Sequence, residues 1–479
     1  MRTRKLLRRR NREIYLFSAL FLGLFAGLFF YLTDYVTDSH EELFNNSYNS
    51  RERVLAQENL RGSIYAATGE ALARTVVSDD GQQTREYPYN EMFAHVVGYS
   101  GKGKTGIEAS ENYSLSNSDI PERTKLENEK AGVKNPGNDV YTTLHTDLQQ
   151  TAYEALGAFR GAIVVTEVKT GRILAMVSKP DFDPNRIAEI WEKVNADTQD
   201  AALVNRVTQG LYPPGSTFKI VTALAYLRQF PDSWESYSYS CSGAYQNGEN
   251  RITCFHGSVH GRVDLTSSFA KSCNCSFANI GMSLDREGFA ETIDSLLFNR
   301  DLPLELPYNR TSVKMGANSS DAEVIQTSIG QGKTQISPMQ LNLITAAIAN
   351  GGELMRPYLV DRVLSAQGVV LRENEPEPYA RLMSEEEAKT LSGFMEAVVR
   401  DGTGRKLKDQ PYTAAGKTGS AEFNQEKADS HAWFTGYAPA EDPQIAVTIL
   451  VEQVGSGGDY AVPLAKRIFD AWFLQQKNG

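Results

Sequence analysis

One stretch near the start of the chain limits the fold more than any other feature. Ile14 to Leu32 (IYLFSALFLGLFAGLFFYL) is a run of 19 residues without a charge, and Asp34 and Asp38 follow it. A helix of this length spans about 30 Å, the thickness of the hydrocarbon core of a bilayer. A cleaved signal peptide is the alternative, but its apolar region usually has about 7–15 residues and ends at a small-x-small site. No clear site of that kind follows, so we expect an uncleaved membrane anchor.

Charge is distributed unevenly on the two sides of this run. Seven Lys and Arg residues lie before residue 13, so a formal net charge of −10 for the whole chain becomes −17 for the rest. Basic flanks stay on the cytoplasmic side of a membrane. We therefore expect a single-pass protein with a cytoplasmic N-terminus and an extracytoplasmic remainder. The acidic remainder argues against a nucleic-acid partner, because such binding depends chiefly on Lys and Arg that neutralise phosphates.

The segment GYSGKGKT at residues 98–105 matches the phosphate-loop pattern G-x4-G-K-T. That pattern binds nucleotides only where a buried strand precedes it and a helix follows it. The residues after it (GIEASENYSL) do not form a convincing apolar helix face, and an exported domain has no routine access to nucleotides. We interpret the segment as a glycine-rich turn.

The composition changes near residue 138. Before it the chain is polar with short apolar patches, which predicts an extended, mostly β pedestal. After it, strand patterns occur at both ends of the remaining sequence, and helical patterns dominate between them to about residue 400. This order predicts an α+β fold in which one antiparallel sheet is flanked by helices. The predicted division is a basic tail at 1–13, an anchor at 14–34, a pedestal at 35–138 and a C-terminal domain at 139–479.

The strongest chemical signal is LYPPGSTFK at residues 211–219. Two prolines and a glycine are poor residues for a helix interior, so a helix should begin at Ser216. Ser216 and Lys219 then lie at positions i and i+3 on one face. A serine hydroxyl needs a base to become a nucleophile, and a lysine amine can serve when burial or a second cation lowers its pKa. The alternative is a serine cap with a surface lysine, which S-x-x-K alone does not exclude.

Two further motifs strengthen the chemical interpretation. Ser272-Cys273-Asn274 supplies a hydroxyl and an amide two residues apart at an expected junction between helices. Lys417-Thr418-Gly419-Ser420 lies in an expected strand, where the first two side chains point to opposite faces and the glycine lets a ligand approach the backbone. In order and spacing, the three motifs match the signature of serine–lysine acyl transferases.

With these motifs, the sequence resembles the class B penicillin-binding proteins, which are monofunctional peptidoglycan D,D-transpeptidases, over nearly its whole length. The family's segment RG-x-I-x-(D/N)-R-x-G-x-x-LA resembles RGSIY at 61–65 with GEALA at 69–73, although Ala66 and Ala67 depart from its polar centre. Other resemblances to the family lie in REYP at 85–88, AHVVGY at 94–99, GIE at 106–108, GRILAM at 171–176 and FDPN at 182–185. The lack of a second catalytic domain between anchor and pedestal distinguishes the chain from class A, and the short pedestal resembles that of elongation-type members.

The resemblance implies a role for each nucleophilic and basic residue. Ser216 would attack the penultimate D-Ala carbonyl of a stem peptide, with Lys219 as its base. Ser272 would relay a proton to the leaving amine, and Asn274 would hold the substrate amide and order Lys219. The acyl-enzyme would then react with an amine from a neighbouring stem peptide.

The strand motif would bind the substrate. Lys417 and Thr418 would hold its terminal carboxylate, and Gly419 would allow its close approach. Backbone N–H groups of Ser216 and Ser420 would form the oxyanion hole. Lys417, as a second cation, would also disfavour the protonated form of Lys219.

The resemblance also implies partners. They are peptidoglycan stem peptides, β-lactam antibiotics as covalent inhibitors, and a SEDS-type glycan polymerase in the membrane; no cofactor is implied. A scaffold that activates the polymerase, a D,D-carboxypeptidase and a β-lactam sensor or β-lactamase remain alternatives. Cys273 stands where class A β-lactamases carry Asp, which favours the transpeptidase.

A second Lys-Thr pair, Lys333-Thr334 in GQGKTQ, does not repeat the strand motif because Gln335 replaces its glycine. We expect IGQG at 329–332 to form a turn before a helix, and contact of this turn with substrate stays open.

The chain has four cysteines, at positions 241, 254, 273 and 275. An extracytoplasmic location permits disulfides, so a Cys241–Cys254 bridge and free thiols are both open. Cys254 and Cys241 with His256 and His260 fit no standard zinc spacing, so no metal is expected. His431, which precedes a strand pattern, is expected to be structural.

Overall fold

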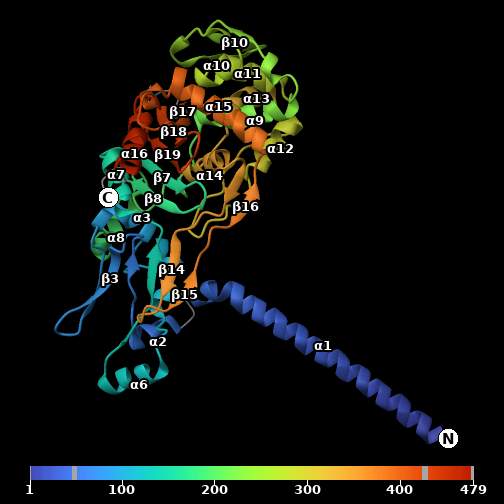
Figure 1. The fold of residues 1–479 in the computed structure, drawn as a ribbon. Coiled ribbons are helices and arrows are strands. Elements are labelled where there is room, and N and C mark those ends of the chain that lie inside the picture. Colours follow the sequence, from blue (N-terminus) through green and yellow to red (C-terminus); the bar gives the residue numbers. More distant parts are fainter. Residues whose placement is uncertain (1, 46–50, 423–429, 476–479) are drawn as a thin grey trace.

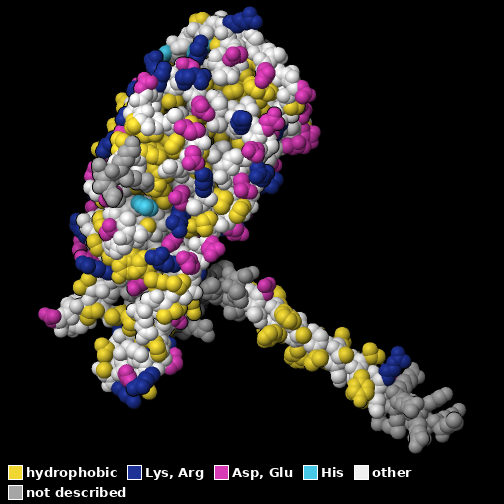
Figure 2. Space-filling model, in the orientation of Figure 1, with side chains coloured by type: hydrophobic (Ala, Val, Ile, Leu, Met, Phe, Trp, Pro, Cys, Tyr) yellow, Lys and Arg dark blue, Asp and Glu magenta, His cyan; other side chains and the backbone are white. Residues whose placement is uncertain are grey.

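The computed structural model describes residues 2–45, 51–422 and 430–475. Figure 1 shows a long N-terminal helix, α1 (Arg2–Asn45), that projects from the foot of the molecule. Residues Asn11–Tyr35 of α1 form a 25-residue apolar span that is 0% buried. Hydrophobic side chains are exposed along this helix (Figure 2), an arrangement that is stable in lipid rather than in water. The helix anchors the protein in a membrane, as the sequence predicted.

The pedestal is built on a six-stranded sheet in the order β15-β14-β6-β2-β3-β4. The elements that precede residue 143 are α2 (Arg51–Glu58), β1 (Asn59–Leu60), β2 (Ile64–Tyr65), β3 (Ala71–Val77), β4 (Gln83–Glu86), η1 (Asn90–Phe93), α3 (Ala94–Val97), α4 (Gly106–Ser110), α5 (Asn112–Ser116), α6 (Glu122–Ala131), β5 (Asn135–Pro136) and β6 (Asp139–Thr142). The residues of the phosphate-loop pattern connect α3 to α4, so no strand precedes them and the interpretation as a turn is confirmed.

Two strands of this sheet come from a distant part of the chain. β14 (Val360–Leu364) pairs antiparallel with β6 and with β15 (Val370–Glu373). The prediction that helical patterns continue to about residue 400 is therefore wrong in this segment, and also at residues 239–263, where short strands occur. Strands of three to five residues contain too few alternations for a period of two to be recognised. The pedestal sheet is complete only when the later hairpin joins it.

A buried carboxylate ties the pedestal together at the motifs that resemble the family. Glu108 has a fully buried side chain and forms ion pairs with Arg61 at 2.6 Å and Arg85 at 2.7 Å. The Tyr87 hydroxyl also donates a hydrogen bond to it. Burial alone would raise the pKa of Glu108, but the two guanidinium groups outweigh this effect and the pKa lies below its usual value.

The head contains the predicted antiparallel sheet, with distant segments as neighbours in the order β17-β18-β19-β7-β8. Its strands are β7 (Gly161–Glu167), β8 (Ile173–Lys179), β17 (Ala415–Glu422), β18 (Ser430–Ala438) and β19 (Ile445–Val451). Helices α7 (Thr146–Leu156) and α16 (Ala461–Gln475) pack on one face. Helix α14 (Pro338–Ala349) packs on the other face. β17 is an edge strand, and this position leaves its outer side available to the active site.

A mostly helical lobe stands beside β17 at the far end from the anchor (Figure 1). The remaining elements of the head are η2 (Pro184–Arg186), α8 (Ile187–Ala196), η3 (Gly215–Phe218), α9 (Lys219–Gln229), η4 (Trp234–Ser236), β9 (Tyr239–Cys241), β10 (Ala244–Asn247), β11 (Asn250–Thr253), η5 (Phe255–Gly257), β12 (Gly261–Val263), α10 (Leu265–Ala270), α11 (Asn274–Ser283), α12 (Arg286–Ser295), α13 (Asp321–Ser328), β13 (Glu353–Met355), β16 (Pro378–Arg381), α15 (Glu385–Asp401) and η6 (Arg405–Leu407). The α+β class predicted from the sequence is confirmed.

Candidate active site

Ser216 lies in the tight turn η3, which leads directly into α9. The turn packs closely against β17: a Cβ atom added at Gly215 would lie 2.8 Å from the carbonyl oxygen of Ser420. Gly215 also has a φ of +54°, a conformation that glycine adopts without strain. The glycine before Ser216 is therefore required both by the backbone and by the neighbouring strand, and it holds the serine at the edge of the sheet.

Lys219, the first residue of α9, is fully buried. Its amine donates hydrogen bonds to the Ser272 carbonyl oxygen at 2.8 Å, to Ser272 Oγ at 3.2 Å and to Asn274 Oδ1 at 2.7 Å. Burial lowers the pKa of Lys219 to about 8, although the neighbouring cysteine thiols act in the opposite direction. A substantial fraction of this amine is therefore neutral near physiological pH and able to accept a proton.

Ser272 lies at the junction between α10 and α11, as the sequence predicted. Its φ is +56°, in the left-handed region that non-glycine residues rarely adopt. In this conformation both its hydroxyl and its carbonyl oxygen face the Lys219 amine. Unusual backbone geometry of this kind is concentrated at functional sites, where surrounding structure holds it in place.

Lys417 approaches the same hydroxyl from the opposite side. Its amine is fully buried and donates to Ser272 Oγ at 2.9 Å. Burial lowers the pKa of Lys417 well below its ordinary value, and repulsion from Lys219 lowers it further. From the sequence we expected repulsion from Lys417 to lower the pKa of Lys219. Repulsion between the two amines instead lowers the pKa of Lys417, and burial accounts for the lowered pKa of Lys219.

The opposite face of β17 presents Thr418 and Ser420 to a cleft, so the predicted alternation along this strand is confirmed. The Thr418 hydroxyl is hydrogen-bonded to the hydroxyl of Thr403. Gly419 lies between Thr418 and Ser420, and a Cβ atom added there would be 2.9 Å from the carbonyl oxygen of Pro214. A glycine at position 419 thus allows β17 to pack closely against the turn that carries Ser216.

The cleft has a volume of about 1920 Å³. Of the predicted site residues, Ser216, Ser272, Asn274, Thr418 and Ser420 line it directly. The two lysines lie beneath this lining and reach it through Ser272. The Lys219 amine makes its hydrogen bonds with Ser272 and Asn274 rather than with Ser216, an arrangement common in ligand-free enzymes, where catalytic contacts tighten on substrate binding.

The turn at residues 329–332 packs against the turn that carries Ser216. The Gly215 N–H donates to the carbonyl oxygen of Gly330 at 2.9 Å, and Gly330 has a φ of +72°. Ile329, Gln331 and Gly332 also line the cleft. Lys333 instead forms an ion pair with Glu323 on the surface. The predicted turn is confirmed, and its principal contact is with the backbone before the nucleophile.

Sequence reasoning missed two groups that border the cleft. Thr403 follows a glycine in DGTG, a short motif with no distinctive chemistry. Glu452 accepts hydrogen bonds from Arg206 at 2.8 Å and from Tyr212 at 2.8 Å, and it pairs with Arg160 at 3.1 Å. These partners are distant in sequence, so no local pattern indicates the network. His431 is buried, and its Nδ1 accepts a hydrogen bond from the Gln453 N–H.

The cysteines form one buried cluster. The Sγ atoms of Cys241 and Cys254 are 3.7 Å apart and all four thiols are free, so the Cys241–Cys254 disulfide left open by the sequence does not form. A disulfide requires about 2.05 Å between sulfur atoms. Cys254 contacts Cys273 and Cys275 as well, and Cys273 lies between the two functional residues of the S-x-N motif.

A serine on a tight turn, two buried amines that share one hydroxyl, and an amide beside them are the groups that a serine acyl transferase uses.

Comparison with known proteins agrees with this class. The family described as penicillin binding protein transpeptidase domain matches residues 161–470, and the penicillin binding protein A dimerisation domain matches residues 61–140. Peptidoglycan D,D-transpeptidase PbpA of Mycolicibacterium smegmatis is 33% identical over 87% of this chain and 90% of its own length.

Solved structures are similar as well. The D,D-transpeptidase domain of a peptidoglycan glycosyltransferase from Eggerthella lenta has a TM-score of 0.79 at 31% identity, and covers 88% of this chain and 99% of its own. A ceftriaxone acyl-enzyme complex of penicillin-binding protein A from M. tuberculosis has a TM-score of 0.79 at 28% identity, over 88% of this chain and 100% of its own. This chain therefore belongs to the penicillin-binding protein transpeptidases and is a class B peptidoglycan D,D-transpeptidase.

Proposed function

We propose that Ser216 carries the acyl-enzyme with which this protein cross-links peptidoglycan stem peptides. The observation that carries the assignment is the shared position of Ser272, whose hydroxyl lies 3.2 Å from the Lys219 amine and 2.9 Å from the Lys417 amine and borders the same cleft as Ser216. No other described cleft residue combines a hydroxyl with a buried amine base in this way.

Lys219 acts as the base in the first step. A neutral amine has two N–H bonds, and the Ser272 carbonyl oxygen and Asn274 Oδ1 accept both of them. Its third position, which in this structure is directed at Ser272 Oγ at 3.2 Å, then holds the lone pair. This lone pair takes the proton of Ser216 when substrate binding tightens the site and Oγ forms a bond to the penultimate D-Ala carbonyl carbon. The oxyanion that develops is stabilised by the backbone N–H groups of Ser216 and Ser420.

The second step breaks the bond to the terminal D-Ala. The proton passes from Lys219 through Ser272 to the leaving amine, and the acyl group stays on Ser216. The amine of a neighbouring stem peptide then attacks the ester, the new peptide bond forms, and Ser216 regains a proton. Lys417 stabilises the hydroxyl relay through Ser272 Oγ, and Thr418, on the cleft face of β17, binds the terminal carboxylate of the donor together with Thr403.

The carboxylates around the cleft favour transfer to an amine over hydrolysis. Asp401, Glu452 and Asp459 line it, and each is held in an ion pair with an Arg or Lys. A carboxylate held in this way is a poor base for water. The described part of the cleft therefore offers no carboxylate outside an ion pair as a base for deacylation by water.

The placement of the parts supports a proposed topology. The tail at 1–13 lies in the cytoplasm, and the anchor at 14–34 crosses the membrane. The pedestal at 35–138, whose sheet also takes β6 and the β14–β15 hairpin from the later part of the chain, raises the catalytic domain above the outer surface. The basic tail favours this orientation. Because no residue that the structure describes covers the apolar side chains of α1, we also propose that a SEDS-type glycan polymerase binds α1 and the pedestal.

One experiment tests the assignment of the nucleophile. Full-length protein is labelled with a fluorescent penicillin and the labelled peptide is mapped. We expect the label on Ser216, and none on the Ser216→Ala variant. Incubation with a stem-peptide donor and an amine acceptor should then yield cross-linked dimer. Release of monomer alone would indicate a D,D-carboxypeptidase, and label on another residue would overturn the assignment.

A further inference from the structure

The segment at residues 239–263 forms a thin lobe above the cleft. It consists of two separate two-stranded ribbons, β9 with β12 and β10 with β11. Only four of its 25 residues are buried, namely Cys241, Gly243, Cys254 and Val263. Isolated two-stranded ribbons are marginally stable, and small modules without a hydrophobic core are usually held by a disulfide or a metal ion.

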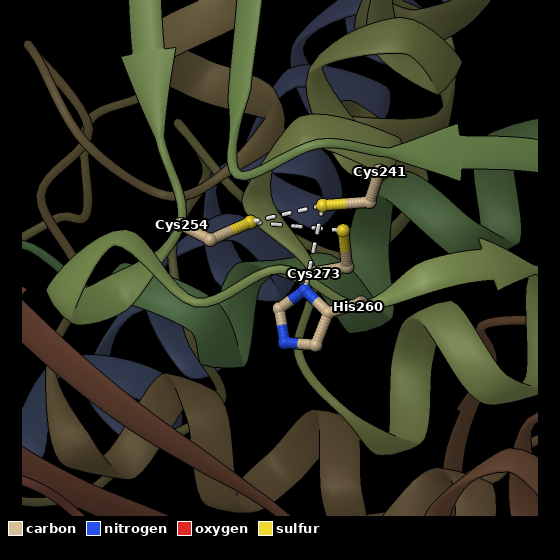
Figure 3. A group of neighbouring side chains, drawn as sticks. All are labelled: Cys241, Cys254, His260 and Cys273. Atoms are coloured by element: carbon tan, nitrogen blue, oxygen red, sulfur yellow. Dashed lines mark hydrogen bonds between the residues drawn. The ribbon is translucent and has the colours of Figure 1, made fainter.

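Four potential metal ligands converge at the base of this lobe (Figure 3). Cys241 ends β9, Cys254 follows β11, His260 precedes β12, and Cys273 caps the N-terminus of α11. Their ligand atoms all lie within 4.8 Å of one another. The three cysteines are buried, whereas His260 is half-buried and lines the cleft, which provides a route for an ion to enter.

Three of the six distances between the ligand atoms match the edges of a tetrahedral zinc site, and the others are at most 4.8 Å. With Zn–S near 2.3 Å and Zn–N near 2.05 Å, the edges of the tetrahedron are about 3.8 Å between sulfurs and about 3.6 Å between sulfur and nitrogen. The observed distances are 3.7 Å for Cys241–Cys254, 3.7 Å for Cys254–Cys273 and 3.6 Å between Cys241 Sγ and His260 Nδ1. These sulfur separations are too long for disulfides and suit ligands around one ion.

From this geometry we propose that Cys241, Cys254, Cys273 and His260 bind a structural Zn²⁺ ion. Thiolate and imidazole ligands in a closed tetrahedral set are typical of zinc. On binding, the three thiols release their protons to solvent, and the site keeps a net charge of −1. The Gly243 and Ser276 N–H groups donate to the sulfurs of Cys241 and Cys273, each at 3.4 Å, and stabilise their thiolate form.

The sequence-based expectation of no metal rested on a different ligand set. It included His256, which is exposed, and omitted Cys273, which lies beyond the lobe at the start of α11. Cys275 is also near, with its sulfur 3.4 Å from Cys254 Sγ. The four ligands named above are the set whose atoms lie mutually close, so Cys275 lies beside the ion without binding it.

The proposed ion connects the lobe to the turn formed by residues 272–274. Cys273 lies between Ser272 and Asn274, and Asn274 Nδ2 also donates to the Thr253 carbonyl oxygen, next to Cys254, at 3.0 Å. Metal binding at Cys273 and this hydrogen bond from Asn274 together fix the S-x-N turn to the ribbons that border the cleft. Cys273 acts as a positioning residue, because its side chain binds the ion and its neighbours contact Lys219.

Metal analysis of the full-length protein tests the site. Protein extracted from membranes in detergent, with no added metal, should contain about one zinc ion per chain. X-ray absorption at the zinc edge should show three sulfur ligands and one nitrogen ligand near the distances of a tetrahedral site. Both measurements use the unmodified chain, so a variant that does not fold leaves the test intact.

Variants then locate the ion. Cys241→Ser, Cys254→Ser and His260→Ala should each lower the zinc content at least tenfold, while the matched variants Cys275→Ser and His256→Ala retain it. Removal of zinc by a chelator should slow acylation by fluorescent penicillin, and zinc added back should restore the rate. Protein that contains no zinc, a Cys241–Cys254 disulfide found by peptide mapping, or zinc retained by the ligand variants would each overturn the proposal.

Discussion

The pedestal and the head each bury a cluster of titratable groups, and the two clusters differ in whether opposite charges are paired. In the pedestal, Glu108 is buried between Arg61 and Arg85, so opposite charges compensate one another. In the head, Lys219 and Lys417 are both fully buried and share the Ser272 hydroxyl. Among the residues that the structure describes, no carboxylate pairs with either amine.

The difference separates a structural cluster from a catalytic one. Burial of ionic groups costs free energy unless they are paired, and the pedestal cluster is paired on both sides of its carboxylate. The amines of the head have only neutral acceptors and the faces of Phe277 and Phe269. Their unfavourable environment favours the neutral form, which is the form that can accept a proton. Burial without a carboxylate partner among the described residues, rather than burial alone, thus distinguishes the amines of this site.

Replacement of the buried Lys219 amine should abolish acylation while the protein still folds. We expect Lys219→Met to slow acylation by penicillin about 10³-fold or more, because the base is removed. Thermal stability should stay the same or increase, since an apolar side chain replaces an unpaired amine. Acylation kinetics and thermal melts of the full-length protein measure both effects. Lys333→Met, at an exposed lysine, is the matched control, and a large loss of stability in Lys219→Met would contradict the comparison.

Loss of the buried carboxylate should have the opposite result. Glu108→Gln leaves two guanidinium groups without compensation and should lower the free energy of unfolding by about 3–5 kcal/mol. Glu122→Gln, where the side chain is exposed, should change it by less than about 0.5 kcal/mol. Urea denaturation gives these values. Folded Glu108→Gln protein should still be acylated at the normal rate; a catalytic defect in the folded fraction would break the distinction.

A carboxylate introduced beside Lys219 should give this amine an oppositely charged partner, as Glu108 has in the pedestal. Asn274 Oδ1 lies 2.7 Å from the Lys219 amine, so Asn274→Asp places a negative charge beside it. An opposite charge at this distance raises a lysine pKa by about 1–3 units. We expect acylation at neutral pH to fall about 10- to 100-fold and to recover in part at high pH. A lower rate with an unchanged pH profile would show that Asn274 acts only through its contacts.

The smallest effect is the pH dependence of the unmodified protein. Burial lowers the pKa of Lys219 to about 8, and its neutral form is the base, so the acylation rate should rise with pH and level off above about 8. Below this value the rate should change about tenfold per pH unit, as expected for one essential group. Stopped-flow acylation between pH 6 and 10 measures the midpoint. A midpoint near 10.5, the value for an exposed lysine, would mean that burial does not tune this amine.

The sequence predicted which groups come together around the cleft, because each lies in a short motif with its own local chemistry. Ser216 and Lys219 are separated by less than one helical turn, and Lys417 and Thr418 alternate along one strand. Most of the head sheet was also predictable, since β7, β8 and β19 are mostly apolar runs of seven residues.

What the sequence did not predict depends on contacts between distant segments. The Glu452 network joins residues about 240 positions apart, and β14 pairs with β6 across more than 200 residues. The cysteine cluster requires Cys273 to return to the ribbons that carry Cys241 and Cys254. No local period or motif encodes such convergence, because it arises only when the domain packs.

The β14–β15 hairpin has a consequence for biogenesis. The pedestal strands β2, β3 and β6 leave the export channel long before residues 360–373, yet the hairpin must pair with β6 to complete their sheet. The half of the molecule nearest the membrane therefore finishes folding after most of the distal half has been translocated. In the proposed topology, a chain cut short before residue 360 would leave β6 as an open strand edge near the membrane, and such an edge is a template for pairing with other chains.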